Sequence, residues 1–138
     1  MDIIYKVNEP ISVDTFVDLL TRSTLGERRP VTNTVCMQGM LDNSNLIVSA
    51  WQGTKLVGIA RCITDFHYCC YLSDLAVDAA CQRLGMGKQL QAQVLAQLEP
   101  TCKLLLIAAP KAKDYYPKLG YSKNERCWEL PAGQALAN

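Results

Sequence analysis

The sequence has little of what metal centres and disulfide scaffolds require. Its 138 residues include one histidine, His67, and seven cysteines, none of which forms a Cys-x-x-Cys pair. Zinc sites usually need such pairs or several histidines. An odd number of cysteines, most of them in apolar strand-like surroundings, is typical of reduced thiols in a reducing compartment. We therefore expect no metal site, and the lack of a second histidine disfavours a nucleophilic cysteine.

Long apolar runs and clustered positive charge are also missing. The longest apolar stretch, residues 104–110, is far too short to span a membrane. The first ten residues contain Asp2 and only short apolar runs, which predicts neither a signal peptide nor a transit peptide. The net charge is +1, with no basic cluster beyond Arg28-Arg29, so no nucleic-acid groove is indicated. These absences favour a cytoplasmic protein without a membrane or nucleic-acid partner.

The apolar pattern that is present predicts a single domain, residues 1–138, built from strands and helices. A hydrophobic content of 49% is enough for one compact core. Apolar runs predict strands over residues 2–7, 46–51, 56–63, 69–77, 103–108 and 126–130, with a hairpin turn at 52–54. Helical spacing, with Ser12 as an N-cap and Pro30 as a second start, predicts helices over residues 13–24, 30–41, 86–98 and 111–119.

The most informative stretch runs from residue 74 to residue 88. It combines a buried strand with Gln82, Gly85 and Gly87 in a Gln-x-x-Gly-x-Gly pattern that opens a helix. A helix N-terminus offers unpaired backbone N–H groups and a positive dipole end, which bind phosphate oxygens. The two glycines lack a Cβ that would keep a pyrophosphate away from the backbone, and they permit positive φ in the turn.

Two nucleotide-binding interpretations of this stretch fail on specific residues. A dinucleotide fingerprint needs a small residue where Leu90 stands, and a phosphate-binding P-loop needs Ser or Thr where Gln89 stands. A tight strand-to-helix turn without a ligand remains the structural alternative.

A second motif lies about thirty residues downstream, where Tyr115, Tyr116, Lys118, Gly120 and Tyr121 follow one another closely. Together the two motifs resemble the GNAT superfamily of acyl-CoA-dependent N-acetyltransferases. The resemblance implies an α/β fold of the α+β type, in the order β-α-α-β-β-β-α-β-α-β. It implies a mixed, mostly antiparallel sheet with helices on its faces.

The resemblance also implies where acetyl-CoA binds as co-substrate. The strand before the phosphate loop splays away from the next strand, and the pantetheine arm pairs with its exposed backbone like an added strand. The cofactor-binding residues implied in this way are Leu75, Ala76, Val77, Gln82, Arg83, Leu84, Gly85, Met86, Gly87, Lys88 and Tyr115.

Two groups are expected to assist the transfer step. The Val77 N–H is the candidate for polarising the thioester carbonyl, because a fixed backbone donor needs no reorganisation. Tyr116 matches the family tyrosine that protonates the departing thiolate, and a phenol with a pKa near 10 suits that task. A core or rim aromatic is the structural alternative for Tyr116.

The general base is harder to assign. Asp74 precedes the cofactor-binding edge and is the candidate for deprotonating the substrate ammonium; a structural role is the alternative. Asp65, His67 and Tyr71 are rivals at the strand ends. Strand parity does not rank them, because family members often carry a β-bulge here that swaps the faces.

Two departures from the family pattern weaken the assignment of Tyr116. Alanine at 109 lacks the side-chain contact that asparagine makes with the cofactor in many members. Pro117 removes a helical N–H and biases Tyr116 away from regular helical geometry.

The expected reaction is direct acetyl transfer to a primary amine of a small molecule in a ternary complex. Arg28-Arg29-Pro30 could bind a carboxylate of the acceptor, or could be an exposed loop. The alternatives are a non-catalytic acyl-CoA-binding sensor and acetylation of a protein or aminoacyl-tRNA amine. Many relatives are homodimers, which the apolar C-terminal stretch would allow.

Overall fold

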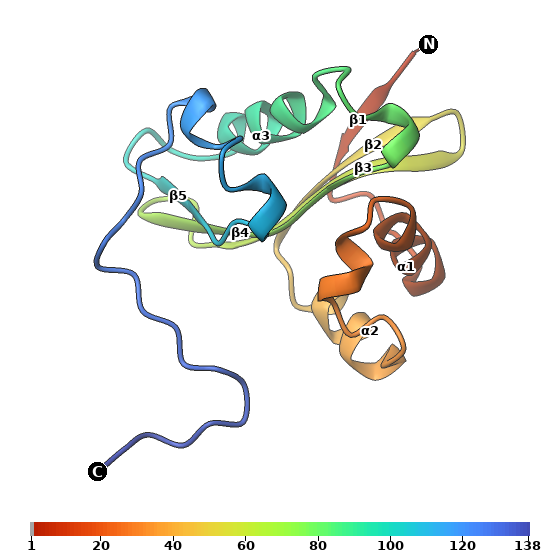
Figure 1. The fold of residues 1–138 in the computed structure, drawn as a ribbon. Helices are drawn as coiled ribbons and strands as arrows, with labels where there is room; N and C mark the ends of the chain where they lie inside the picture. The colour runs from red at the N-terminus through yellow and green to blue at the C-terminus, as the bar shows by residue number, and fades with distance from the viewer. Residues whose placement is uncertain (1) are drawn as a thin grey trace. The chain divides into compact units, whose positions relative to one another are not determined.

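The computed structural model describes residues 2–138, which form two compact units divided between Ile107 and Ala108 (Figure 1). The strands, all in the first unit, are β1 (Ile4–Val7), β2 (Leu46–Gln52), β3 (Lys55–Thr64), β4 (Cys69–Val77) and β5 (Lys103–Leu106). The helices are α1 (Val13–Arg22), α2 (Thr34–Asp42) and α3 (Met86–Ala96), and the 3-10 turns of this unit are η1 (Leu25–Arg28) and η2 (Ala79–Cys81).

The strands form one mixed sheet in the order β1-β2-β3-β4-β5. The first four strands are antiparallel and β5 is parallel to β4, so the predicted mostly antiparallel sheet is confirmed. Helices α1 and α2 lie on one face and α3 on the other (Figure 1). Each face has its own apolar core, one built around Phe16, Leu19 and Leu20 of α1 and the other around Met86, Leu90 and Val94 of α3.

The predicted start of α1 is confirmed, whereas that of α2 is wrong. The Ser12 side chain caps α1 by accepting a hydrogen bond from the Thr15 N–H at 3.2 Å. Helix α2 begins at Thr34 rather than at Pro30, because the Asn33 side chain accepts from the Cys36 N–H at 3.0 Å. The Asn33 side chain accepts a hydrogen bond from a backbone N–H in the first turn, whereas a proline side chain has no acceptor. The helix therefore starts after Asn33.

Small residues let α3 pack close to the sheet. A Cβ added to Gly58 of β3 would lie 3.0 Å from the Met86 sulfur, 3.1 Å from Leu90 Cδ1 and 3.3 Å from the Ala50 Cβ. Glycine within a strand often marks such a close approach. Because Met86 is the first residue of α3, this contact holds the N-terminus of α3 against the sheet.

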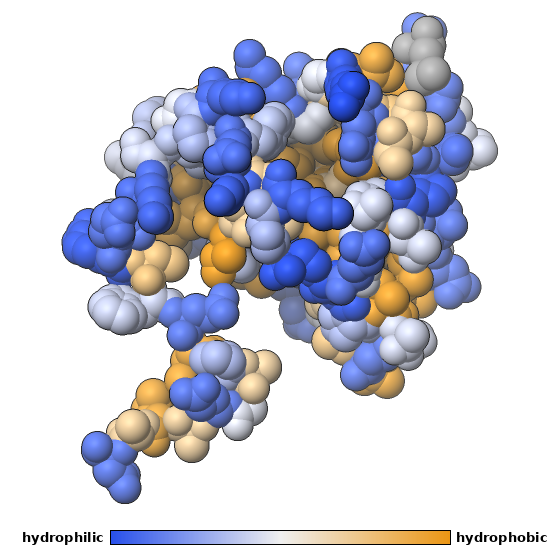
Figure 2. Space-filling view, in the orientation of Figure 1, coloured by the Kyte–Doolittle hydropathy of each residue, from blue (hydrophilic) through white to orange (hydrophobic). Residues whose placement is uncertain are grey.

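The second unit departs most from expectation. In place of one helix over 111–119 it has two 3-10 turns, η3 (Pro110–Ala112) and η4 (Pro117–Leu119), each starting at a proline. The predicted strand at 126–130 is wrong. Asn124 instead accepts from the Arg126 N–H through its side chain and from the Cys127 N–H through its carbonyl, which turns the backbone. Apolar side chains are exposed along this tail (Figure 2), and Trp128 is 92% exposed.

Candidate active site

Strand β4 is open along its C-terminal half. Strand β5 pairs with it only from Cys69 to Leu72, whereas β3 pairs with it as far as Val77. Among the strands of the described residues, β4 therefore has a hydrogen-bonded neighbour on one side only from Ser73 onward. The expected separation of the two strands is present, and Leu75, Ala76 and Val77 lie on the open part.

The backbone groups of this open edge can be assigned from the strand alternation. The Asp78 N–H donates to the Val57 carbonyl of β3 at 2.8 Å. Successive residues of a strand present their backbone groups to opposite sides, so the N–H groups of Leu75 and Val77 point to the open side. The Val77 carbonyl accepts a hydrogen bond from the Gln82 side chain at 3.3 Å. The Val77 N–H therefore points away from β3, toward the open side of β4, which is the direction that donation to a group bound at this edge requires.

A β-bulge at Ser73 changes which side chains face each side of the sheet. Arg61 pairs with Asp74 and Cys62 with Leu72, which leaves Ser73 as the extra residue. Leu72 packs with the α3 core, and after the bulge Leu75 and Val77 pack with that same core. Asp74 therefore faces the α1–α2 side, where sequence parity alone would not have placed it.

The connection from β4 to α3 is exposed at residues 79–80 and 82–85 and includes two residues with positive φ. Gly85 has φ +78 and caps α3 without any side-chain hydrogen bond, and Arg83 has φ +69. Gly87 lies in the first turn of α3 and does not have positive φ. Of the two motif glycines, only Gly85 therefore uses the positive φ that glycine permits. The first N–H groups of a helix lack intrahelical acceptors, and at α3 they are next to the exposed residues 82–85 and Lys88. This arrangement suits an anionic group.

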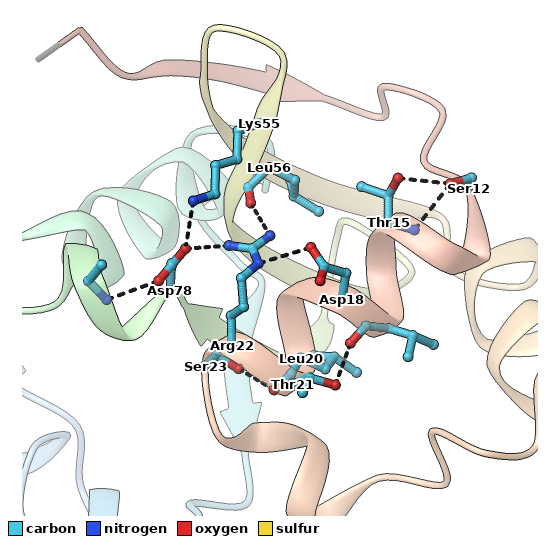
Figure 3. Close-up of polar contacts among 12 residues, drawn as sticks. Ser12, Thr15, Asp18, Leu20, Thr21, Arg22, Ser23, Lys55, Leu56 and Asp78 are labelled. Carbon is cyan, nitrogen blue, oxygen red and sulfur yellow. Dashed lines mark hydrogen bonds and ion pairs between the residues drawn. The ribbon is translucent and has the colours of Figure 1, made fainter.

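Asp78 holds the start of this connection (Figure 3). Its carboxylate accepts from the Ala80 N–H at 2.9 Å, pairs with Arg22 of α1 and lies 3.7 Å from the Lys55 ammonium. Burial alone would raise the pKa of Asp78, but the Ala80 hydrogen bond and the Arg22 and Lys55 charges outweigh it and lower that pKa. Sequence reasoning missed this group, although aspartate before a short helical turn is an N-cap signal.

Asp74 is fully buried between two arginines. Its Oδ1 accepts from Arg29 Nε at 2.6 Å and its Oδ2 from Arg61 Nε at 2.5 Å. Arg29 Nη2 also donates to the Ser73 carbonyl at 2.8 Å. Because both carboxylate oxygens are engaged by guanidinium groups, the geometry favours the structural role of Asp74 over the role of base. The Arg29 guanidinium is likewise engaged, by Asp74 and the Ser73 carbonyl, so of the two alternatives for residues 28–30 it does not match a free carboxylate receptor. Arg28 is exposed, as the loop alternative predicts.

The rivals for the general base lie in the turn before β4, in the case of Asp65 and His67, or in the first half of β4, in the case of Tyr71. Asp65 accepts from the backbone N–H groups of Tyr68, Cys69 and His67, which lowers its pKa. Asp65 therefore holds the turn before β4, and Tyr71 lies in the half that pairs with β5. Both are at the opposite end of β4 from the open edge.

The second unit contains the three tyrosines of the second motif. The Tyr116 ring makes edge-to-face contacts with Tyr115 and Tyr121, with ring centroids 5.1 and 5.4 Å away. Burial, followed by the neighbouring Tyr115, raises the pKa of Tyr116. The phenol therefore keeps its proton at neutral pH, as a proton donor must.

No group of three potential metal ligands lies together within the described residues 2–138. Over the same range, no helix is long and apolar enough to cross a membrane.

Comparison with solved structures defines the fold as that of an acetyltransferase. A GNAT family acetyltransferase from Streptococcus pneumoniae matches this structure with a TM-score of 0.73 at 23% identity. The match covers 94% of this chain and 98% of the S. pneumoniae chain. A probable acetyltransferase from Staphylococcus aureus has a TM-score of 0.74 at 18% identity, with coverage of 95% and 100%.

The family model for the acetyltransferase (GNAT) domain matches residues 24–129, so the chain belongs to the GNAT family. An uncharacterized N-acetyltransferase ycf52-like of Prochlorococcus marinus is 31% identical in an alignment of length 120 that covers 80% of this chain and 65% of the relative. The ycf52 N-acetyltransferase of Pyropia yezoensis is 33% identical over 90 residues, with 61% and 52% covered. The chain thus spans about half to two thirds of these relatives.

Proposed function

We propose that this protein transfers an acetyl group from acetyl-CoA to a primary amine of a small molecule, by direct attack in a ternary complex. The observation that carries the proposal is the sequence of an open β4 edge, a glycine-capped turn and the N-terminus of α3. GNAT domains are generally acyl-CoA dependent, and this edge and helix end match the two chemically different parts of such a cofactor.

The residues present fit both parts. The backbone N–H groups of Leu75 and Val77 on the open edge can pair with the pantetheine amides as a neighbouring strand would. The N–H groups at residues 84–88, with the exposed cations of Arg83 and Lys88, can bind the pyrophosphate. Gln82 supports this geometry by donating to the Val77 carbonyl, and Tyr115 remains a proposed cofactor contact from the family pattern.

The chain supplies two groups for the chemistry. When bound, acetyl-CoA provides an activated thioester and a thiolate leaving group. The Val77 N–H would donate a hydrogen bond to the carbonyl oxygen as negative charge develops on it. Tyr116, proposed from the family pattern, would donate its phenolic proton to the departing thiolate, and its raised pKa keeps that proton in place until transfer. The proton that the amine nitrogen loses on forming the amide would return to the Tyr116 phenolate through solvent.

The experiment is a thermal unfolding titration with acetyl-CoA, with free CoA and ATP as controls. A ligand that binds only the folded state stabilises it by about 2.7 kcal/mol at 100 times its Kd, which raises the midpoint by several degrees. We expect saturable rises with acetyl-CoA and CoA and little change with ATP. No rise at millimolar acetyl-CoA would make the Gly85 turn purely structural.

A screen of amino acids, polyamines, an N-terminal peptide and an aminoacyl-tRNA then separates the enzymatic alternatives. Binding without transfer to any of them would favour the non-catalytic acyl-CoA sensor. Exclusive use of the peptide or the tRNA would replace the small-molecule acceptor.

The proton donor is tested by Tyr116→Phe, with Tyr68→Phe as the control because Tyr68 is an exposed tyrosine of the first unit. We expect the Tyr116 variant to lower kcat well over tenfold while its acetyl-CoA affinity stays close to that of the original protein. An unchanged kcat would remove Tyr116 from the mechanism.

A further inference from the structure

Residues 23–28, here called the bridging segment, connect α1 to the turn before α2 and are flanked by Arg22 and Arg29. Each of these arginines pairs with an aspartate at one end of the open β4 edge. Asp74 precedes Leu75–Val77 and Asp78 follows it. The segment therefore begins and ends on the two sides of the edge to which the cofactor is proposed to bind.

The first attachment is at Arg22 (Figure 3). One guanidinium nitrogen donates to the Asp78 carboxylate, and Nη2 donates to the Leu56 carbonyl of β3 at 2.8 Å. The Asp78 side chain is 6% exposed. Arg22 Nε also pairs with Asp18 of α1 at 2.9 Å, so the guanidinium is held on three sides.

The second attachment is at Arg29 and is more deeply buried. Arg29 bonds both the Asp74 carboxylate and the Ser73 carbonyl, at 2.6 and 2.8 Å. Arg61 holds the other Asp74 oxygen and donates to the Ser73 hydroxyl at 2.8 Å. The carboxylate is therefore fixed from two directions, and Arg29 contacts the β-bulge at which β4 separates from β5.

The bridging segment has a defined conformation of its own. Thr24 has φ +72, and a Cβ on Gly26 would lie 3.2 Å from the Leu20 carbonyl oxygen and 3.3 Å from the Thr21 Cα. The Ser23 hydroxyl donates to the Leu20 carbonyl at 2.9 Å and accepts from the Leu25 N–H at 3.2 Å. These contacts hold the segment against the last turn of α1.

We propose that Arg22 and Arg29 are positioning residues that make the bridging segment and the open β4 edge move as one body. An acceptor amine held beside this segment then meets the thioester in a constant geometry, on which transfer rates depend strongly. In this account Asp74 orients Arg29 and does not take a proton. The inference rests on the proposed function for the identity of the ligand at the edge.

The test compares Arg29→Gln with Arg28→Gln in amide hydrogen exchange, with and without free CoA. The control removes the same charge from the neighbouring residue, which is exposed. In the free protein, we expect Arg29→Gln to speed amide exchange within the bridging segment, residues 23–28, at least tenfold. Arg28→Gln should leave that exchange within twofold of the original protein. On addition of CoA, the original protein and Arg28→Gln gain protection at both β4 and the bridging segment.

In Arg29→Gln we expect the CoA Kd to stay within twofold of that of the original protein. CoA should still protect the amides of β4 from exchange, but it should give the bridging segment no added protection. A merely stabilising arginine would not separate these two responses. With an acceptor found in the amine screen, the acceptor KM rises at least fivefold while the acetyl-CoA KM stays within twofold.

Equal exchange rates of the bridging segment in the two variants would overturn the proposal. It would also be overturned if Arg29→Gln lost CoA-induced protection to the same extent at β4 and at the bridging segment. If CoA fails to bind the original protein, the proposed function fails instead, and exchange in the free protein still decides whether Arg29 holds the segment.

Discussion

The two sides of the open β4 edge are built in different ways. On the α3 side, residues 82–85 are exposed, Gly85 caps the helix without a side chain, and the polar groups are backbone N–H groups together with the exposed Arg83 and Lys88 side chains. On the α1–α2 side, the strand ends are held by buried charges, with Asp74 between two arginines and Asp78 against Arg22. The first side has exposed donors to which the cofactor is proposed to bind, and the second is fixed by ion pairs.

This difference assigns separate effects to separate residues. Changes on the α3 side should alter ligand affinity with modest effects on stability. Changes on the α1–α2 side should alter stability and the coupling of the bridging segment, with smaller effects on cofactor affinity. The following variants test that division.

The largest effect is expected for Asp74→Ala, which leaves the buried Arg61 guanidinium without its partner. Loss of one member of a buried ion pair typically lowers the free energy of unfolding by about 3–5 kcal/mol. Asp18→Ala is the control, because Asp18 also pairs with an arginine but its side chain is 65% exposed. That pair should contribute less than about 1 kcal/mol. Urea unfolding measures the free energy of unfolding of both variants. Equal losses of free energy in Asp74→Ala and Asp18→Ala would contradict the structural role assigned to Asp74.

A somewhat smaller effect is expected for Gly58→Ala. The added Cβ would meet the Met86 sulfur at 3.0 Å, and such overpacking costs about 1–3 kcal/mol. Gly39→Ala is the opposite case, because nothing lies within 4 Å of its added Cβ in α2 and alanine favours a helix by about 0.5–1 kcal/mol. Thermal unfolding should therefore move in opposite directions, and two stabilised variants would show that α3 does not pack tightly at Gly58.

Gly85→Ala and Gly53→Ala separate backbone strain from ligand binding. Both glycines have positive φ, +78 and +61, and open space around an added Cβ, so each variant should lose about 1–2 kcal/mol of stability. Only Gly85→Ala adds a group beside the proposed pyrophosphate site. We expect its acetyl-CoA Kd to rise about tenfold, or about 1.4 kcal/mol, and that of Gly53→Ala to stay unchanged. Calorimetric titration distinguishes them, and equal affinities would contradict the site.

The smallest effect concerns pH and Asp78. The pKa of Asp78 is lowered in the folded protein, so its contribution is fully present above the unfolded value of about 3.9 and is lost as pH falls through the folded value. The difference in unfolding free energy between the original protein and Asp78→Asn should stay constant from pH 7 to about pH 5 and shrink below about pH 4. A difference that grows on acidification would reverse the sign of the Asp78 contribution.

The same comparison explains what sequence reasoning could find. The α3 side depends on neighbours in sequence, so strand β4, the Gly85 turn and the start of α3 were all predicted from local patterns. The α1–α2 side depends on Arg29 and Asp74, 45 residues apart, and Arg22 and Asp78, 56 residues apart. No local pattern specifies such pairs, and the bulge at Ser73 moves Asp74 to the face that simple alternation would not choose.

The errors in the second unit have a different origin. A strand needs a partner for its backbone groups, and residues 126–130, which include Cys127, Trp128 and Leu130, were predicted to form one. The Asn124 hydrogen bonds turn the chain instead. Pro117 likewise divided a predicted helix into separate turns, since proline lacks the N–H that would continue it.

The most direct test of the account is an amide spectrum of the isotope-labelled protein during a CoA titration. The account requires the largest shifts at the N–H groups of Leu75, Val77 and residues 84–88. The molecule also offers a separate cavity of about 420 Å³, lined by residues of the β1–α1 loop, α2 and the start of β2, including Glu9, Asp42 and Ile47. Shifts confined to that cavity, with the β4 edge and the start of α3 unchanged, would contradict it.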